Sequence, residues 1–476
     1  MILQSEANIP TVLVIFGITG DLSMGKLLPA LYHLQKNGML PDIFKVIGVA
    51  RSEYTDRQFQ DLVQQKMESV KNMDFDEYTW KGFADSLTYL KGELTDKKTY
   101  ENLANKLNKI DDKYGICTHK VFYMAIYPEL IEKVIEGIQH SLLFQICKNT
   151  KDTKVVVEKP FGESLSDFDA LNKKIGKAFS EKQIYRIDHF LGKETVQNIM
   201  YFRAANPIFF GNWNKKNIDM IEVSVYESIG IEKRGRYFDQ YGQLRDMVQS
   251  HLIQLLAVSL MDLPDKLDPD KIANSKADLI GKLKIKDLKN DILRAQYKEG
   301  VVDGSMVKAY ADEEFVSPDS ETETFVRINA EIEGGNWDGL KVRLVTGKRL
   351  QQKNTVIKIH YKQGSVIEGV SGHNQLMVNI QPKEGIVLEM LVKRPGSDKL
   401  DKVDMVFNYK ESFHTILPDA YEKILLDIVR LKRGISISAG ELEASWKFVD
   451  TIRNYWKKTK PQMVFYSAGS KEILDQ

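Results

Sequence analysis

The sequence predicts an α/β protein with two parts. We expect a doubly wound N-terminal domain on a parallel sheet, followed by an α+β C-terminal domain on a large, mostly antiparallel sheet. Up to residue 157, continuous apolar strands alternate with helical stretches, which is typical of βαβ units. After about residue 185 the strands alternate apolar and polar residues, which indicates one solvated face. We therefore predict domains at residues 1–185 and 186–476.

The first strand and the helix after it define the N-terminal pattern. Residues 11–16 read Thr-Val-Leu-Val-Ile-Phe, an apolar and β-branched run that suits a strand buried on both faces. Within residues 26–35, leucines recur at helical spacing. Further buried strands are predicted at residues 45–50, 121–126 and 154–157.

Period-two strands and one long helix define the C-terminal pattern. Residues 220–226 read Met-Ile-Glu-Val-Ser-Val-Tyr, and residues 324–333 alternate in the same way. An apolar helix is predicted between them, at residues 247–261. Two more alternating strands are expected at residues 356–361 and 376–381.

The charge and hydropathy of the chain exclude several classes of protein. The 476 residues include 67 basic and 66 acidic side chains, a balance that argues against binding nucleic acid by bulk electrostatics. No apolar run reaches the ~18 residues needed to span a bilayer, so we expect no membrane partner. The first residues show no cationic stretch before an apolar one, so we expect no signal peptide and a cytoplasmic protein.

A glycine turn, Gly17-Ile18-Thr19-Gly20, follows the first strand. Glycine lets the backbone approach a pyrophosphate, and the helix N-terminus beyond offers N–H groups. One glycine of the usual G-x-G-x-x-G pattern is missing, and a turn that needs glycine only for its geometry is the alternative. The second strand ends at Arg51, where an arginine can pair with the 2′-phosphate of NADP or can be a plain surface charge. Together these features predict a Rossmann-like NADP site.

Two polar clusters are candidates for substrate binding. Lys159 follows an apolar strand in Glu158-Lys159-Pro160, where it can hold a phosphate or a sugar hydroxyl. A cis bond before Pro160 would aim Lys159 into the crevice, and a plain turn is the alternative. His189 and Lys193 are four residues apart, so on a helix they would share a face and clamp one phosphate, or form a solvated face.

His251 is the candidate general base. It leads into an apolar helix, so we expect it to be poorly solvated, neutral at pH 7 and ready to accept a proton. A carboxylate on its other nitrogen would orient it, and both Asp188 and Asp246 are candidates. The alternative is a hydrogen-bonded core histidine. The sequence has no His-x-x-x-His or Cys-x-x-Cys spacing, so no metal site is predicted.

Taken together, these clusters resemble the glucose-6-phosphate dehydrogenase family, in order along nearly the whole chain. The N-terminal motifs that carry the resemblance are Gly17-Ile-Thr-Gly-Asp-Leu22, Val49-Ala-Arg51-Ser, Glu158-Lys-Pro-Phe-Gly162 and Arg186-Ile-Asp-His-Phe-Leu-Gly-Lys-Glu194. Beyond the segment at 245–251, it continues through Pro318-Asp-Ser-Glu-Thr-Glu-Thr-Phe325, Thr346-Gly-Lys-Arg-Leu350 and Asp419-Ala-Tyr-Glu-Lys-Ile-Leu-Leu-Asp427.

The resemblance implies oxidation of D-glucose 6-phosphate to 6-phospho-D-glucono-1,5-lactone with hydride transfer to NADP⁺, the first step of the oxidative pentose phosphate pathway. His251 would take the proton from the C1 hydroxyl, and Asp188 would orient His251. His189 and Lys193 would hold the 6-phosphate. The other substrate ligands would be Lys159, Glu227, Asp246, Lys348, Lys353, Gln381 and Lys26. The coenzyme ligands would be Gly17, Thr19, Gly20, Asp21, Leu22, Arg51 and Lys159.

Four departures from the family pattern affect binding. Phe190 replaces a tyrosine, and the loss of its charge-assisted hydrogen bond would weaken substrate binding by ~1.5–3 kcal/mol. Lys353 replaces an arginine, which turns a bidentate phosphate contact into a point charge. Tyr127 replaces the first proline of a pair. Met24-Gly25 replaces a more basic pair near the coenzyme, which softens the preference for NADP over NAD.

Two other functions compete with this interpretation. One is a related NAD(P)-dependent dehydrogenase that acts on another sugar or sugar phosphate, since Glu-Lys-Pro after a strand also occurs in the glucose–fructose oxidoreductase class. The other is a non-catalytic, NADP-binding sensor, against which the retained Asp188 and His251 speak. The resemblance also implies a homodimer formed through the large sheet, or a homotetramer.

Overall fold

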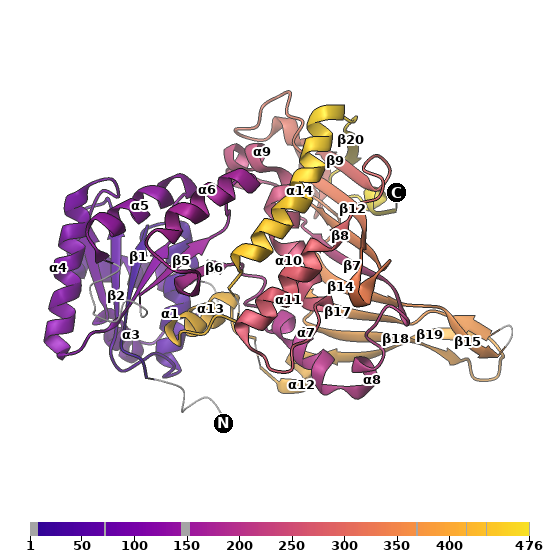
Figure 1. Cartoon of the computed structure of the whole chain (residues 1–476), viewed down its shortest axis with the longest axis horizontal. Coiled ribbons are helices and arrows are strands. Elements are labelled where there is room, and N and C mark those ends of the chain that lie inside the picture. The colour runs from indigo at the N-terminus through magenta and orange to yellow at the C-terminus, as the bar shows by residue number, and fades with distance from the viewer. Residues whose placement is uncertain are drawn as a thin grey trace. The chain divides into compact units, whose positions relative to one another are not determined.

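The chain divides into two compact units in a computed structural model that describes residues 8–70, 73–143, 153–367, 370–415, 417–434 and 436–475 (Figure 1). The first unit comprises Met1–Gly192 and Pro418–Ala439, and the second comprises Lys193–Leu417 and Gly440–Gln476. The sequence contained no signal that residues 418–439 return to the N-terminal unit. The domain bounds 1–185 and 186–476 stay a prediction.

A six-stranded parallel sheet forms the centre of the first unit, with strand order β3-β2-β1-β4-β5-β6. This order is the one found in doubly wound dinucleotide-binding folds, so the predicted fold of the N-terminal part is confirmed. The strands are β1 (Thr11–Phe16), β2 (Phe44–Ala50), β3 (Leu87–Lys91), β4 (His119–Met124), β5 (Lys154–Glu158) and β6 (Ile184–Ile187).

The buried side chains of β1 show why this segment is a central strand. Every residue of β1 is fully buried, and the five from Val12 to Phe16 are apolar. Removing each such apolar side chain from water contributes roughly 1.5–3 kcal/mol, which favours a strand covered on both faces. β4 ends two residues earlier than predicted, at Met124. β3 was not predicted, because five residues with mixed polarity give a weak signal.

Helices connect the strands of this sheet. α2 begins with a capping box between Thr55 and Gln58, and α5 begins at Pro128, where the missing N–H costs nothing. α13 comes from the distant segment after residue 417 and packs on α1 (Figure 1). The helices of this unit are η1 (Ser23–Leu27), α1 (Leu28–Lys36), α2 (Asp56–Glu68), α3 (Glu77–Ala84), α4 (Lys97–Tyr114), α5 (Pro128–His140), α6 (Leu165–Gly176), η4 (Glu181–Gln183) and α13 (Ala420–Val429).

The second unit is built on a ten-stranded sheet with the order β19-β18-β17-β14-β7-β13-β12-β9-β20, to which β8 adds beside β12. Among the described strands of this sheet, only the β7–β13 and β9–β20 pairs are parallel, so the predicted large and mostly antiparallel sheet is confirmed. Its strands are β7 (Ile218–Tyr226), β8 (Leu283–Lys284), β9 (Ile292–Lys298), β12 (Phe325–Ile332), β13 (Lys341–Gly347), β14 (Asn354–Tyr361), β17 (Gln375–Gln381), β18 (Gly385–Lys393), β19 (Leu400–Asn408) and β20 (Val464–Ser467).

Helices and two small hairpins complete the second unit. The hairpins pair β10 (Gly300–Val302) with β11 (Ser305–Val307) and β15 (Gly364–Ile367) with β16 (Val370–Gly372). Within the described residues, no helix is both long and apolar enough to cross a membrane. The helices are α7 (Glu194–Ala205), α8 (Pro207–Phe210), η5 (Glu232–Arg234), α9 (Gly235–Gln243), η6 (Leu244–Leu252), α10 (Ile253–Leu260), α11 (Pro269–Gly281), η7 (Tyr310–Asp312), η8 (Gly335–Trp337), α12 (Tyr409–Phe413), α14 (Ala439–Thr459) and α15 (Glu472–Asp475).

A buried ion pair joins three helices of the second unit. The Lys276 ammonium on α11 lies 2.7 Å from the Glu441 carboxylate on α14, and both side chains are almost completely buried. Lys276 also donates a hydrogen bond to Gln254 Oε1 on α10, at 3.1 Å. Because α10 continues directly from η6, this pair fixes the helix that carries His251.

Replacing Glu441 should destabilise the protein strongly. Glu441→Leu leaves the Lys276 charge buried without its carboxylate, at an expected cost of ~3–5 kcal/mol. The double variant Glu441→Leu with Lys276→Met should recover most of that loss, because it removes both charges. Thermal unfolding of the two variants measures the difference, and a single variant as stable as the double variant would contradict the assignment.

Candidate active site

A cavity of about 670 Å³ opens in the first unit at the carboxyl ends of the parallel strands. Ligands of doubly wound folds bind at this edge of the sheet. The cavity is lined by all seven residues that were predicted to bind the coenzyme: Gly17, Thr19, Gly20, Asp21, Leu22, Arg51 and Lys159. The fold therefore brings together residues that are up to 142 positions apart in the sequence, and their individual roles stay predictions.

The turn after β1 depends on the missing side chain of Gly17. Its φ is +82°, and a Cβ atom there would lie 2.2 Å from the carbonyl oxygen of Ala125. Any other residue at this position would force β1 and the end of β4 apart. The helix begins at Asp21, directly after Gly20, so its first N–H groups lie at this turn, an arrangement that suits a bound anion. Together these features fit a dinucleotide pyrophosphate.

The other walls of the cavity come from the ends of the neighbouring strands. Arg51 follows β2 and is exposed, so its guanidinium can reach a ligand phosphate. Tyr127, one of the departures from the family pattern, also lines the cavity and is 78% exposed. Sequence reasoning did not name the remaining lining residues as ligands. They come from the ends of β2, β3, β4 and β5 and from α5: Val49, Ala50, Ser52, Glu93, Leu94, Met124, Ala125, Ile126, Leu130 and Glu158.

The peptide bond between Lys159 and Pro160 is cis, as the sequence suggested. Lys159 lines the cavity from the turn after β5. Lys26 lies on η1, outside the lining of this cavity, and pairs with Asp419 at 2.8 Å. Its side chain is about half exposed, at 52%.

Asp188 and His189 lie in the turn that follows β6. Asp188 is buried, and its Oδ1 accepts a hydrogen bond from the Phe190 N–H at 2.9 Å. The Phe190 ring is buried and lies 4.8 Å from the His189 ring. The helix considered for His189 and Lys193 does not form here, because residues 188–193 are turns and α7 begins only at Glu194. The turn is held by hydrogen bonds from Leu191 N to Asp188 O and from Gly192 N to His189 O.

In the second unit, four predicted substrate ligands lie at one end of the large sheet. Tyr226 pairs with Gly347 on β13 and with Asn354 on β14, and Thr355 pairs with Gln381 on β17. This register places the residues next to these positions at the same sheet end. They are Glu227, Lys348, Lys353 and Gln381.

Glu227 and Lys348 form an ion pair at this sheet end. The Lys348 ammonium is fully buried and lies 2.7 Å from a Glu227 carboxylate oxygen. It also sits 5.1 Å from the centre of the Phe238 ring, where a cation is favoured. The Gln381 amide donates to Thr355 Oγ1 at 3.1 Å, and Lys353 is exposed. This end of the sheet thus presents a mixture of charges that suits a polar, anionic ligand.

His251 and Asp246 lie on η6, and both are buried. The predicted helix at residues 247–261 is observed as two segments, a π-helical η6 and the α-helical α10. π-Helical turns inside helices often mark functional sites. η6 packs against β7 and β13, the strands that Glu227 and Lys348 directly follow. Gln249 on η6 donates to Ser445 Oγ at 3.0 Å.

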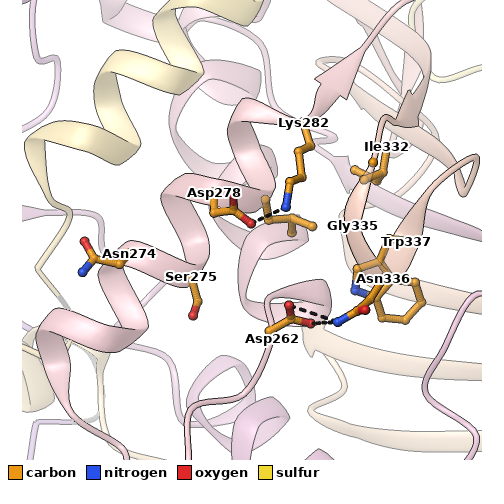
Figure 2. Close-up of a pocket in the computed structure, with 11 residues that line it drawn as sticks. Asp262, Asn274, Ser275, Asp278, Lys282, Ile332, Gly335, Asn336 and Trp337 are labelled. Carbon is orange, nitrogen blue, oxygen red and sulfur yellow. Dashed lines mark hydrogen bonds and ion pairs between the residues drawn. The ribbon is translucent and has the colours of Figure 1, made fainter.

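A second cavity, of about 270 Å³, lies in the second unit beside α11 (Figure 2). Its polar side chains interact with one another. Lys282 pairs with Asp278 at 2.5 Å, and the Asn336 amide donates to the Asp262 carboxylate at 3.1 and 3.2 Å. None of the predicted site residues lines it. We assign no function to this cavity.

Comparison with known proteins places the chain in a family. Residues 14–198 match the glucose-6-phosphate dehydrogenase NAD binding domain, and residues 200–473 match the C-terminal domain of the same family. The glucose-6-phosphate 1-dehydrogenases of Chlamydia muridarum and Bacillus subtilis are both 36% identical to the chain. Their alignments cover 97% and 96% of this chain and 93% and 94% of the relatives.

A solved structure agrees with these matches. It is described as glucose-6-phosphate dehydrogenase in complex with its substrate glucose-6-phosphate, and it superposes with a TM-score of 0.91 at 31% identity. The superposition covers 99% of this chain and 97% of that structure. The sequence motifs, the two folds and these comparisons lead to one conclusion: the chain belongs to the glucose-6-phosphate dehydrogenase family.

Proposed function

We propose that this oxidoreductase converts D-glucose 6-phosphate to 6-phospho-D-glucono-1,5-lactone and passes the hydride to NADP⁺, the first step of the oxidative pentose phosphate pathway. The observation that carries the proposal is the single cavity onto which all seven predicted coenzyme residues converge. The substrate named for the structure at 31% identity supports the choice of sugar phosphate. We also propose a cytoplasmic location.

The proposed chemistry assigns the proton to His251. His251 takes the proton from the C1 hydroxyl of the sugar while the hydride leaves C1, and Asp188 orients the imidazole and stabilises its charged form. When bound, the coenzyme supplies the hydride acceptor. Each side chain is buried in its own unit, which supports these roles because water screens a buried charge little.

The substrate ligands are assigned as the resemblance implies. His189 and Lys193 bind the 6-phosphate, with Lys353 as a further cation. Asp246, Glu227, Lys348 and Gln381 bind sugar hydroxyls or the phosphate, and Lys159 contacts both substrate and coenzyme. Lys26 stays a proposed ligand near the site. Its ion pair with Asp419 must break before the Lys26 ammonium can bind a substrate.

Phe190 favours a second candidate, a dehydrogenase acting on another sugar or sugar phosphate. Its buried ring stands where the family has a phosphate-binding tyrosine. The first assay should mix the protein with glucose 6-phosphate and NADP⁺ or NAD⁺, and should follow the reduced nicotinamide by absorbance. NADPH formation that is absent with free glucose supports the proposal. Turnover with other sugars alone would favour the second candidate, and binding of NADP⁺ without any turnover would favour a sensor.

Replacing the proposed base should abolish turnover without preventing binding. We expect His251→Asn to lower kcat by ~10²–10⁴-fold, because a positioned general base contributes about that factor. The Kd for NADP⁺ should change little. His360→Asn is the control, since His360 is a half-buried histidine of the second unit that interacts with Gln375. Equal losses in both variants would indicate a structural defect rather than a lost base.

Arg51 should set the preference for NADP over NAD. Arg51→Ala removes a charge-assisted contact to the 2′-phosphate, so we expect kcat/KM for NADP⁺ to fall by ~10–100-fold. The value for NAD⁺, which lacks this phosphate, should stay nearly constant. Arg57→Ala, on an exposed face of α2, is the control. An unchanged NADP⁺/NAD⁺ ratio in the Arg51 variant would overturn the assignment.

We further propose that two copies of the chain associate through the β19 end of the large sheet. β19 is paired on one side only, by β18, and so presents a nine-residue edge. Four apolar side chains on this strand are exposed by 37–64%: Leu400, Val403, Met405 and Val406. Exposed apolar residues on an open strand edge favour an interface. A homodimer, or a homotetramer built from it, follows.

A charge at this edge should weaken the association. Val406→Lys is expected to shift the protein from dimer towards monomer, because the lysine would be desolvated in the interface. Light scattering coupled to size-exclusion chromatography measures the change. Tyr78→Lys, at a 92% exposed residue of the first unit, is the control and should leave the oligomer intact. A dimer that survives Val406→Lys would place the interface elsewhere.

A further inference from the structure

A carboxyl group in the wall of the coenzyme cavity is held by two tyrosines from distant segments. Glu158 ends β5 and lines the cavity. The Tyr123 hydroxyl on β4 donates a hydrogen bond to Glu158 Oε1 at 2.6 Å. The Tyr421 hydroxyl, on α13, also hydrogen-bonds this carboxyl. We call Tyr123, Glu158 and Tyr421 the carboxyl clamp.

Burial and the neighbouring groups change the pKa of the Glu158 carboxyl in opposite directions. Burial raises the pKa of the Glu158 carboxyl to about 7, and the nearby Asp188 carboxylate adds to the increase. The two phenols and the Lys159 ammonium oppose it, because they favour the carboxylate. Burial raises the pKa of both phenols, so they stay neutral hydrogen-bond donors. Glu158 therefore changes its charge near neutral pH.

α13 is anchored to the helix that follows the coenzyme turn, which fixes the place of Tyr421. Asp419, the N-cap of α13, pairs with Lys26 at 2.8 Å. Glu422, one turn later, lies 3.2 Å from His33 Nδ1 on α1, and this contact raises the pKa of His33. The segment after residue 417 thus contacts η1 and α1, and its Tyr421 hydrogen-bonds Glu158 at the end of β5.

We propose that the carboxyl clamp is a positioning element of the coenzyme site, in which Tyr123 and Tyr421 hold the Glu158 carboxyl at the cavity wall and Glu158 takes up a proton from solvent when the anionic coenzyme binds. This inference rests on the proposed coenzyme site. A carboxylate in the wall of a cavity repels a bound pyrophosphate and phosphate, and the repulsion is strong where little water screens it. Protonation to the neutral acid removes it.

The proposal fixes the sign of the pH dependence. Below about pH 7 the Glu158 carboxyl is already protonated, so coenzyme binding takes up few protons. Above about pH 7 the carboxylate must gain a proton when the coenzyme binds, which costs binding free energy. The affinity for NADP⁺ should therefore fall as the pH rises through about 7. Without a phenol donor, the carboxylate is less stabilised, so the fall should move to higher pH, by about one unit for each lost hydrogen bond.

Titration calorimetry of NADP⁺ binding tests this directly. Runs in buffers of different ionisation enthalpy give the number of protons taken up, across about pH 6 to 9. The wild-type protein should take up a fraction of a proton just above pH 7, and Glu158→Gln should lose that uptake. The coenzyme 2′-phosphate titrates near pH ~6 and contributes equally in both proteins, so the difference between them isolates Glu158.

Three phenylalanine variants distinguish the effect of the two clamp hydrogen bonds on Glu158 from the general effect of removing a buried tyrosine hydroxyl. Tyr421→Phe and Tyr123→Phe should keep the uptake but move it to higher pH. Tyr32→Phe is the matched control, because Tyr32 is a buried tyrosine of α1 that hydrogen-bonds Asp76 and does not line the cavity. The Tyr32 variant should match the wild type. An unmoved profile in both clamp variants would overturn the proposal.

Failure of the clamp and failure of the proposed coenzyme have different signatures. A folded wild-type protein that does not bind NADP⁺ would contradict the coenzyme proposal. The clamp is then tested on the free protein by the infrared band of a protonated carboxyl, which should disappear around pH 7 in the wild type and be missing in Glu158→Gln. A wild type that lacks this titrating band overturns the clamp whatever the coenzyme.

Discussion

The coenzyme site depends on a single steric constraint, the close approach of two backbones at Gly17. The carbonyl of Ala125 occupies the space that a Cβ atom would need, so the turn after β1 can lie against the end of β4 only with glycine in place. Gly17 N donates to Val49 O on β2, which joins the same turn to the strand that carries Arg51. The three strand ends thereby form one wall, and the cavity for a dinucleotide follows from their contact.

A comparable constraint orders the second unit, where strand register takes the place of a glycine turn. Because β7, β13, β14 and β17 pair as direct neighbours, the residues at and just beyond their paired ends lie at the same end of the sheet. A fully buried lysine there requires a carboxylate, and the Glu227–Lys348 pair meets that requirement. Polar groups held in a buried position lose little mobility when a ligand arrives, and such preorganisation is what binding and catalysis require.

Segments distant in sequence complete the first unit. α13 packs on α1 and brings Asp419, Tyr421 and Glu422 to three separate parts of the N-terminal unit. Such contacts tie the geometry of the coenzyme turn to a part of the chain about 400 residues later.

The sequence by itself determined the two fold classes, the first strand and the coenzyme turn, because β-branched runs, period-two strands and glycines act through local geometry. It also sufficed to name Lys159, Arg51 and His251 as candidates. Other features were decided only by the tertiary structure: the short β3, the turn instead of a helix at residues 188–193, the ion pair of Lys348 and the clamp on Glu158. Each of these depends on contacts between segments that sequence periodicity does not connect, and burial by those segments is what changes the charge of a group such as Glu158.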